Sequence, residues 1–456
     1  MNLISKLREI VGQEYVLTSP EDLICYGYDA QHAQHLPEAV VRPSDAEQVA
    51  ELVRLANEES IPLTPRGAGT GLSGGSVPSH GGIVADFCRM NRILDIDREN
   101  LLATVEPGVI TADLHAAVEA VSLMYPPDPG SMKVSTIGGN VAENAGGLRA
   151  IKYGVTKDYV MVVEGVAPTG EPFKAGAQTM KSVSGYDLAR LMCGSEGTLG
   201  IFTKVVLKLI PLPKSRRSVL ASFAGIEDAA RAVSGIISVG IMPATLEIMD
   251  NMTIRAVEEF KKLGLPVDAG ALLLFESDGA LAQVEEEASE ATSVMQKNGA
   301  SDIQTASDSA ERDRIWEGRR ASLAALARVR PTTVLEDATV PRSRLAEMVA
   351  KINSIADKYS LTIGTFGHAG DGNLHPTILT DERDTGEMAR VEKAVGEIFE
   401  AALRLGGTVS GEHGIGLSKA HFLPMEFGPG TMSMMRSIKS ALDPKGILNP
   451  GKIFEE

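Results

Sequence analysis

Two short segments near the end of the sequence concentrate side chains that can bind a metal. Three of the eight histidines, His368, His375 and His413, lie in "FGHAGDGNLHP" and "GGTVSGEHGIG". The glycines, aspartate and asparagine between His368 and His375 argue against a helix there, and a hairpin-like turn would bring the two imidazoles together. Two imidazoles and a carboxylate suit a divalent metal that keeps coordination positions open for a substrate. Spacing alone is equally compatible with structural histidines that cap turns.

A second candidate site is the glycine-rich stretch "PRGAGTGLSGG", residues 65–75, in which Gly69-x-Gly71-x-x-Gly74 matches the dinucleotide fingerprint. That fingerprint needs a helix directly after the glycines. The following "GSVPSHGGIV" contains Pro78 and two further glycines, so no helix is expected. Successive backbone N–H groups can instead form a nest for a phosphate. Arg66 would add positive charge, and the Thr70 and Ser73 hydroxyls would add donors.

Three glycine-containing blocks, in this order, resemble the FAD-binding domain of the vanillyl-alcohol oxidase/PCMH flavoprotein superfamily. The blocks are "PRGAGTGLSGGS", "PPDPGSMKVSTIGGNVAENAGG" and "GSEGTLGIFTKVVLKL". The resemblance implies an FAD held between two α+β subdomains, with the first loop around the pyrophosphate and the later blocks around the flavin. The covalent histidine of some relatives has no counterpart near Thr70, which favours a non-covalent flavin.

The same resemblance implies which residues bind FAD. Those of the first loop would hold the phosphates: Arg66, Gly67, Gly69, Thr70, Gly71 and Ser73. Those of the second block would line the ring and the ribitol: Asp128, Thr136, Gly138, Gly139, Asn140 and Asn144. Those of the third block would contact the adenine side or the isoalloxazine: Glu196, Gly197 and Ile201. Asn449, in the terminal "NPGKIF", would return to the flavin.

The C-terminal motifs are similar to those of FAD-linked D-2-hydroxyacid dehydrogenases, most closely the FAD-binding subunit of glycolate oxidase and D-lactate dehydrogenase. The resemblance implies that His368, His375 and Glu412 bind zinc or manganese and that His413 is the base. Glu412 and His413 are adjacent, so on an extended backbone their side chains would point in opposite directions and take different roles.

The implied reaction explains why a base and a metal would occur together. Oxidation of an α-hydroxy acid removes a hydride, which the flavin accepts, and a hydroxyl proton. An alcohol resembling water has a pKa of about 15.7, whereas an unperturbed imidazole has a pKa of about 6.5. That gap of about 9 units corresponds to roughly 12 kcal/mol. A zinc ion lowers the pKa of bound water by about this amount. An imidazole alone is therefore expected to be too weak a base.

The substrate carboxylate needs a cation. In "RIWEGRRASLAAL", Trp316 and Arg319 resemble the family's Trp-x-x-Arg, whose arginine clamps the carboxylate in a bidentate fork. The alternative is a solvated helix charge, which is the interpretation for Arg320. The 2-hydroxyglutarate enzymes place a Lys before "D-x-S-x-P", where this chain has Leu335 and then "EDATVP". With Leu323 also apolar, a small monocarboxylate such as D-lactate or glycolate is expected rather than a diacid.

Composition limits the partners. There are 60 acidic and 44 basic residues, a net charge of −16, which argues against nucleic acid. The three cysteines form no Cys-x-x-Cys, so electrons would leave to an iron–sulfur subunit, an electron-transfer flavoprotein or a quinone-linked carrier.

No secretory signal or transmembrane run is seen, which favours a cytoplasmic protein, membrane-associated only through partner subunits. A homo-oligomer is compatible with the sequence. Alternatives are an oxygen-using flavin oxidase and a non-catalytic scaffold subunit.

The elements that must position these residues indicate an α+β protein. Residues 45–60 have helical spacing, with Ser44 as N-cap and Glu47 completing a capping box. Residues 1–213 are expected to form a PCMH-type FAD-binding domain of two α+β subdomains. Residues 214–430 would form a substrate and metal domain, a mainly antiparallel sheet covered by helices. Residues 431–456 would return to the flavin.

Overall fold

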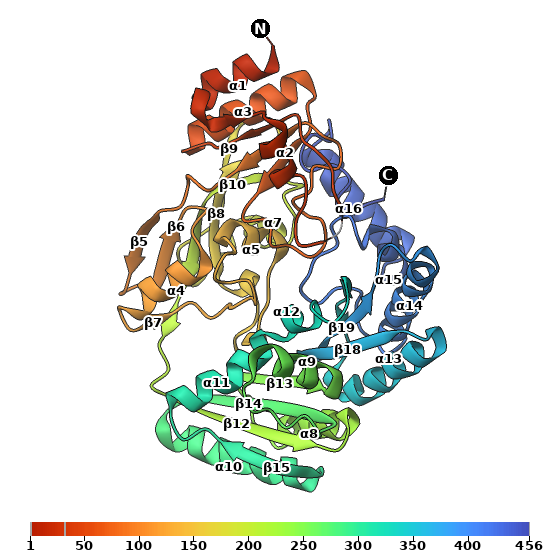
Figure 1. Cartoon of the computed structure of the whole chain (residues 1–456). Coiled ribbons are helices and arrows are strands. Elements are labelled where there is room, and N and C mark those ends of the chain that lie inside the picture. The colour runs from red at the N-terminus through yellow and green to blue at the C-terminus, as the bar shows by residue number, and fades with distance from the viewer. Residues whose placement is uncertain (1, 32, 456) are drawn as a thin grey trace. The chain divides into compact units, whose positions relative to one another are not determined.

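The computed structural model describes residues 2–31 and 33–455, which form two compact units (Figure 1). Unit 1 comprises Met1–Gly146, Val155–Leu212 and Glu412–Glu456, and unit 2 comprises Gly147–Gly154 and Pro213–Gly411. The chain leaves unit 1 at Leu212, next to residue 213, where the sequence suggested the end of the FAD-binding domain. Residues 412–430, assigned from sequence to the substrate domain, belong to unit 1, and residues 147–154 belong to unit 2.

The first half of unit 1 is a four-stranded sheet with helices packed on it. The strand order is β1-β2-β4-β3, in which β2, β4 and β3 are parallel and β1 is antiparallel to β2. Its core combines Leu7 and Val53 from two helices with Ile83 from a central strand. The elements are α1 (Leu3–Val11), η1 (Gln13–Tyr15), β1 (Val16–Leu17), α2 (Pro20–Tyr26), β2 (Ala39–Val41), α3 (Ala46–Glu59), β3 (Leu63–Arg66) and β4 (Ile83–Asp86).

Helix α3 is the helix predicted from residues 45–60, and it buries the expected apolar face. The predicted cap was wrong by one residue. Asp45, rather than Ser44, is the N-cap, and its Oδ1 accepts from the backbone N–H groups of Glu47 and Gln48. Serine and aspartate are both favoured N-cap residues, so their order in the sequence could not decide between them.

The second half of unit 1 is a five-stranded antiparallel sheet with the order β5-β6-β10-β8-β9, beside a two-stranded ribbon of β7 and β11. The elements are β5 (Ile93–Asp97), β6 (Leu102–Val105), α4 (Thr111–Glu119), β7 (Leu123–Met124), α5 (Ile137–Glu143), η2 (Thr156–Asp158), β8 (Val160–Val166), β9 (Pro172–Gly176), α7 (Leu188–Met192), β10 (Ile201–Lys208) and β11 (Ile210–Pro211). Unit 1 therefore has the two α+β halves that the sequence predicted.

The end of the chain returns to the first of these halves. Leu448 forms a parallel bridge with Leu63 of β3, and the Asn449 N–H donates to the Leu63 carbonyl at 3.0 Å. This segment holds η4 (Ala420–Phe422), α15 (Leu423–Glu426) and α16 (Pro429–Leu442). The backbone pairing fixes where the terminal "NPGKIF" lies within unit 1.

Unit 2 is built on one sheet with the order β15-β12-β14-β13-β18-β19-β16, and β17 also pairs with β19. Every pairing is antiparallel, as predicted. The strands are β12 (Ser215–Phe223), β13 (Thr245–Asp250), β14 (Ala271–Gly279), β15 (Ala300–Thr305), β16 (Thr332–Leu335), β17 (Ala338–Thr339), β18 (Thr362–His368) and β19 (Asn373–Thr380).

Helices cover this sheet in two groups (Figure 1). Helices α9, α11 and α12 share a core with Met249, Leu274 and Phe366 of the strands. Helix α8 packs on β13 and β14, on α10 and on α13, which in turn contacts α14. The helical elements are α6 (Ala150–Tyr153), α8 (Ile226–Ser238), α9 (Asn251–Lys261), α10 (Leu281–Lys297), α11 (Ser309–Arg320), α12 (Ser322–Leu326), η3 (Arg342–Arg344), α13 (Leu345–Tyr359) and α14 (Thr385–Arg404).

Among the described residues, none of the helices has both the length and the apolar character needed to cross a bilayer.

The junction of β13 and α9 gives a pH-dependent prediction. Asp250 caps α9 through the Thr253 N–H at 2.8 Å and accepts from the Thr365 N–H. Burial raises the pKa of Asp250 to about 6. Because this exceeds the value in an unfolded chain, the folded protein holds the proton more tightly. The resulting stabilisation is complete below about pH 4 and is lost as pH rises through about 6.

We therefore expect wild type to lose up to about 3 kcal/mol of unfolding free energy, relative to Asp250→Asn, between pH 4 and 7. Urea unfolding of both proteins across that range measures it. Asp384→Asn, at the exposed N-cap of α14, is the control and should track wild type. Parallel pH profiles for wild type and Asp250→Asn would contradict the assignment.

Candidate active site

The three glycine blocks, far apart in sequence, meet in unit 1. A methyl group on Gly67 of the first block would lie 2.3 Å from Thr136 Oγ1 of the second. One on Gly197 of the third block would lie 2.4 Å from Pro65. Such distances are shorter than real carbon contacts, so a side chain at either position would force its neighbour to shift. The blocks that resemblance assigned to one cofactor are thus neighbours.

The first block is an open loop, and no helix follows it, as predicted; the next element is β4. Gly69 and Gly74 adopt φ of +68° and +81°, a region that favours glycine. Ser73 is fully buried, and its Oγ has no hydrogen-bond partner among the residues that the structure describes. A buried hydroxyl of this kind is expected to have a partner, so the loop fits a phosphate as its missing acceptor.

Arg66 lies at the base of this loop, where its Nη1 donates to the Tyr28 carbonyl at 2.7 Å and to Ser76 Oγ at 3.3 Å. Its burial lowers its pKa, and the nearby Asp29 opposes this. These bonds tie both sides of the loop together. The contribution of Arg66 to phosphate binding stays a prediction.

The second block forms the start of α5. Thr136 is the N-cap, and its Oγ1 accepts from the Gly139 N–H at 3.2 Å. Asn140 Nδ2 donates to Thr111 Oγ1, and Asn144, in the left-handed region, closes the helix and accepts from the Lys157 N–H. Both asparagine side chains therefore tie the block to other segments of unit 1. Asp128 is buried in the loop before it, and Gly138 packs on Pro107.

The third block connects to the C-terminal segment through Glu196. Its two carboxylate oxygens accept from the Ile415 and Gly416 N–H groups, each at 2.7 Å. Asn449 Nδ2 donates to the carbonyls of Gly75 and Glu196, each at 2.7 Å. Ile201, at the start of β10, is buried. Glu196 thus fastens the loop that follows His413 to the third glycine block, and Asn449 fastens the end of the chain to the first and third blocks; sequence reasoning did not anticipate these roles.

Glu143 is a residue that sequence reasoning missed. Methyl groups on Gly75 and Gly414 would lie 2.4 and 2.2 Å from its two carboxyl oxygens, so it fills the space between the first block and the C-terminal loop. Burial, and then repulsion by Glu196, raise the pKa of Glu143 well above its usual range. Its letter stands within "NVAENAGG", where nothing distinguishes it from a surface glutamate at the end of a helix.

In unit 2, the sequence-predicted hairpin is present and brings His368 and His375 together. His368 ends β18 and His375 lies in β19, opposite Phe366. The imidazole centroids are 5.1 Å apart with perpendicular planes, and ligand nitrogens of the two rings lie within 4.8 Å of each other. Both histidines are buried. Two imidazoles in this arrangement fit a divalent metal.

A fully buried carboxylate that was not predicted lies beside this pair. Glu247 of β13 has no exposed surface, and its Oε1 is 2.8 Å from His368 Nδ1. Its Oε2 accepts from Arg319 Nε at 2.7 Å. The signal in the sequence was a charge in the middle of the apolar strand "ATLEIMD", because a glutamate is rarely buried without a partner.

Arg319 is buried near the end of α11, as a functional residue would be and unlike a solvated helix charge. Its guanidinium lies 4.8 Å from the centre of the Phe366 ring, and Phe366 lies 5.3 Å from the His375 ring. Arg320 is exposed, in line with its interpretation as a surface charge. Leu323 and Leu335 pack against the core that contains Phe366, so the two expected apolar positions lie at one cluster.

A network of polar side chains holds the start of the "SGEHG" loop, residues 410–414. Asp337 is fully buried and accepts from Ser410 Oγ at 3.0 Å and from the Gly411 N–H at 2.8 Å. Thr339 Oγ1 donates to Asn373 Oδ1 at 2.9 Å, next to Gly411. Gly411 is the last residue of unit 2, and Glu412 follows it across one peptide bond.

Glu412 and His413 open the last segment of unit 1. Their backbone is bent rather than extended, and Glu412 Oε1 lies 3.9 Å from His413 Nε2. The expectation of opposite directions, which required an extended backbone, is therefore wrong. Gly146 lies against Glu412, since a methyl group there would be 2.9 Å from Glu412 Oε2.

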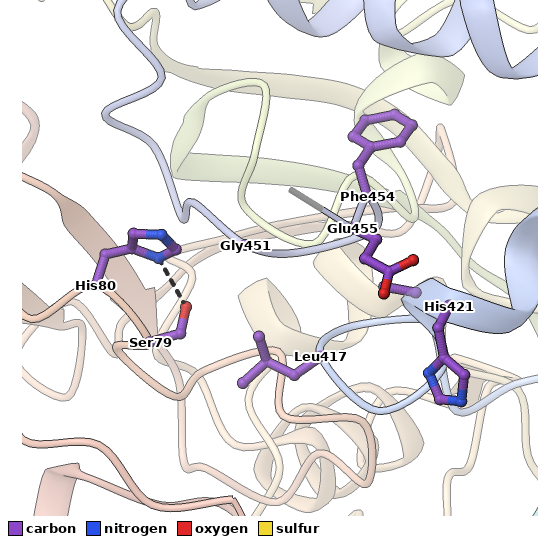
Figure 2. A pocket seen from close by; sticks show the side chains of 8 residues that line it. Ser79, His80, Leu417, His421, Gly451, Phe454 and Glu455 are labelled. Atoms are coloured by element: carbon purple, nitrogen blue, oxygen red, sulfur yellow. Dashed lines mark hydrogen bonds between the residues drawn. The ribbon is translucent and has the colours of Figure 1, made fainter.

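A pocket of about 230 Å³ lies in unit 1 (Figure 2). Leu417, which lines it, also lies against Gly74 of the first glycine block. The residues expected to bind FAD do not line it, so it gives no position for the cofactor. Its lining is Ser79, His80, Leu417, Ala420, His421, Gly451, Phe454 and Glu455.

Comparison with known proteins identifies the class. Residues 37–176 match the family model "FAD binding domain", and residues 212–453 match "FAD linked oxidases, C-terminal domain". The glycolate oxidase subunit GlcD of Bacillus subtilis is 49% identical over 450 residues, which cover 98% of this chain and 96% of the relative. The D-lactate dehydrogenase of Anaerostipes hadrus is 39% identical over 465 residues, 99% of this chain and 97% of the relative.

Solved structures agree on the fold. p-Cresol methylhydroxylase with substrate bound has a TM-score of 0.81 at 19% identity, and covers 99% of this chain and 96% of its own. The 4-ethylphenol oxidase of Gulosibacter chungangensis has a TM-score of 0.79 at 20% identity, with the same coverage. The chain belongs to the FAD-linked oxidase family, has the PCMH-type fold, and is an FAD-linked oxidoreductase.

The contact between the glycine blocks predicts a defect in flavin binding. Gly67→Ala should push Thr136 away from the first loop and lower the FAD content of purified protein at least several-fold. The 450-to-280 nm absorbance ratio after desalting measures this. Gly430→Ala, at a position with open space around it, is the control and should keep full flavin. Full flavin in Gly67→Ala would contradict the proposed convergence of the blocks on FAD.

Proposed function

We propose that this chain oxidises a small D-2-hydroxy acid, D-lactate or glycolate, to the 2-keto acid with the help of FAD and a divalent metal. The observation that carries the proposal is the buried His368–His375 pair, held at one side by Glu247. The relatives named glycolate oxidase subunit and D-lactate dehydrogenase support the substrate class.

His368, His375 and Glu412 would hold zinc or manganese. Nitrogen and carboxylate ligands suit both ions. His368 has the outer-sphere carboxylate that metal-bound imidazoles usually have. Glu412 directly follows Gly411 in the chain. The Gly411 N–H donates a hydrogen bond to the buried Asp337, which restrains the backbone next to Glu412. When bound, the metal would lower the pKa of the substrate hydroxyl.

His413 would accept the hydroxyl proton on its imidazole. FAD, when bound, would supply the acceptor for the hydride on the carbon that bears this hydroxyl. The carbinol thus loses one proton and one hydride, which leaves the carbonyl of the 2-keto acid. The bonds from Glu196 to Ile415 and Gly416 support this role, because they restrain the backbone two residues after the base.

Arg319 would bind the substrate carboxylate. Its guanidinium is buried against Phe366 and its Nε bond to Glu247 leaves it little freedom to rotate. Leu323 and Leu335 offer no second cation, so a diacid would bury an unpaired carboxylate there, at a considerable cost. This favours D-lactate and glycolate over D-2-hydroxyglutarate.

The reduced flavin would pass its electrons to a separate partner. The sequence has three cysteines and no Cys-x-x-Cys, so an iron–sulfur subunit, an electron-transfer flavoprotein or a quinone-linked carrier would take them. The word "subunit" in the name of the Bacillus subtilis relative supports an assembly of this kind.

Anaerobic flavin bleaching tests the proposal. D-lactate or glycolate should bleach the flavin at least 10-fold faster than L-lactate or D-2-hydroxyglutarate. Chelation should suppress the reaction, and added Zn²⁺ or Mn²⁺ should restore it. Bleaching that is fastest with D-2-hydroxyglutarate would refute the substrate assignment. Indifference to chelation, with no metal by elemental analysis, would refute the metal.

Replacement of the base gives a separate prediction. His413→Ala should remain a yellow, folded protein whose flavin is bleached about 10²–10⁴-fold more slowly, the usual contribution of a positioned base. His421→Ala, an exposed histidine in the same C-terminal segment, is the matched control and should bleach at the wild-type rate. Stopped-flow absorbance at 450 nm measures both, and an unchanged rate in His413→Ala would exclude it from the reaction.

A further inference from the structure

Glu247 occupies a position that needs an explanation beyond the stability of the sheet. It lies in β13, between strands β14 and β18, and its side chain has no exposed surface. A carboxylate in such a place is costly unless each oxygen has a charged or hydrogen-bonding partner. Glu247 meets this condition with two side chains, one from α11 and one from the end of β18.

The two partners take different oxygens. His368 Nδ1 lies 2.8 Å from Oε1, and Arg319 Nε lies 2.7 Å from Oε2. When Glu247 is ionised it can only accept, so in that state His368 Nδ1 is the donor of this hydrogen bond. Its Nε2 then presents the lone pair in the neutral ring, which is the form that binds a metal.

The two partners of Glu247 in turn contact aromatic rings. The His368 ring stands perpendicular to that of His375 at 5.1 Å, and the Arg319 guanidinium lies over Phe366 at 4.8 Å. One anion therefore sets the tautomer and orientation of one imidazole and the orientation of one guanidinium. Without it, each of these two side chains could adopt other rotamers.

We propose that Glu247 is a positioning residue that presents His368 Nε2 to the metal and, through its other oxygen, presents Arg319 to the substrate carboxylate. This inference rests on the proposed function, and deepens it, because it assigns the two halves of substrate recognition to one buried anion. A purely structural ion pair would hold α11 on the sheet and leave metal affinity unchanged.

The chain provides a matched control for that structural role. Glu276 of β14 is also a buried carboxylate, and its Oε2 accepts from Ser218 Oγ at 2.6 Å and from Trp316 Nε1 at 3.0 Å. Trp316 and Arg319 lie on the same helix, α11. Glu276→Gln thus loosens the attachment of α11 without touching His368.

The test is Mn²⁺ binding to the FAD-loaded full chain, with free Mn²⁺ counted by its electron paramagnetic resonance signal. Glu247→Gln should bind Mn²⁺ about 10- to 100-fold more weakly than wild type, the usual effect of losing an outer-sphere carboxylate. Glu276→Gln should bind like wild type. In steady state with excess Mn²⁺, Glu247→Gln should show a raised KM for D-lactate or glycolate, since Arg319 is no longer held.

The outcomes are distinguishable. If wild type binds no Mn²⁺ and no Zn²⁺, the proposed metal assistance fails. If wild type binds Mn²⁺ and Glu247→Gln binds it equally, the positioning role fails while the proposed function stands. Equal weakening in Glu276→Gln would also overturn the inference. If Glu247→Gln does not fold, Glu247→Asp keeps the charge but withdraws it by one methylene, and wild-type Mn²⁺ affinity there would contradict the proposal.

Discussion

Burial of an ionised carboxylate is costly unless its oxygens have charged or hydrogen-bonding partners, and in the second unit that constraint organises the candidate chemistry. Glu247, on a central strand, is matched by His368 on one oxygen and by Arg319 on the other. Glu247 and His368 lie on neighbouring antiparallel strands, and Arg319 lies on a helix that shares a core with this sheet, so all three side chains start from regular elements. Rigid support of this kind is what a site needs when small displacements cost rate.

In the first unit the constraint is different: the glycine blocks lie very close to one another. Gly67 and Gly197 are places where a single added carbon would collide with a neighbouring block. Glu196 and Asn449 then fasten the C-terminal segment to the same blocks through backbone N–H and carbonyl groups. Cofactor loop and candidate base are thereby parts of one hydrogen-bonded assembly, although more than 200 residues separate Glu196 from Ile415 along the chain.

Local signals in the sequence predicted local structure well. The spacing of Val49 and Val53 predicted α3, and the glycines between His368 and His375 predicted the hairpin that joins them. Proline after the first glycine loop excluded a Rossmann helix. Two predictions were wrong for physical reasons. Ser44 and Asp45 are both favoured N-cap residues, so the sequence could not decide between them. The backbone at Glu412 is bent rather than extended, which local sequence does not determine.

Partners across the fold could not be predicted. Glu247, Glu143 and Asp337 are single acidic letters whose burial depends on strands and loops distant in sequence. The packing of two segments could not be predicted either. The sequence placed residues 147–154 in the FAD-binding domain and residues 412–430 in the substrate domain, but by packing they belong to unit 2 and unit 1, respectively. Resemblance supplied the FAD and metal assignments, whereas the structure shows which side chains contact and support the residues so assigned.

X-ray absorption at the metal edge of Zn²⁺- or Mn²⁺-loaded, FAD-containing protein would identify the ligand atoms of the proposed metal site. We predict a shell of nitrogen and oxygen only, with the outer scattering of two imidazoles, and loss of one imidazole in His368→Ala. A shell without imidazole, or one unchanged by that substitution, would contradict it.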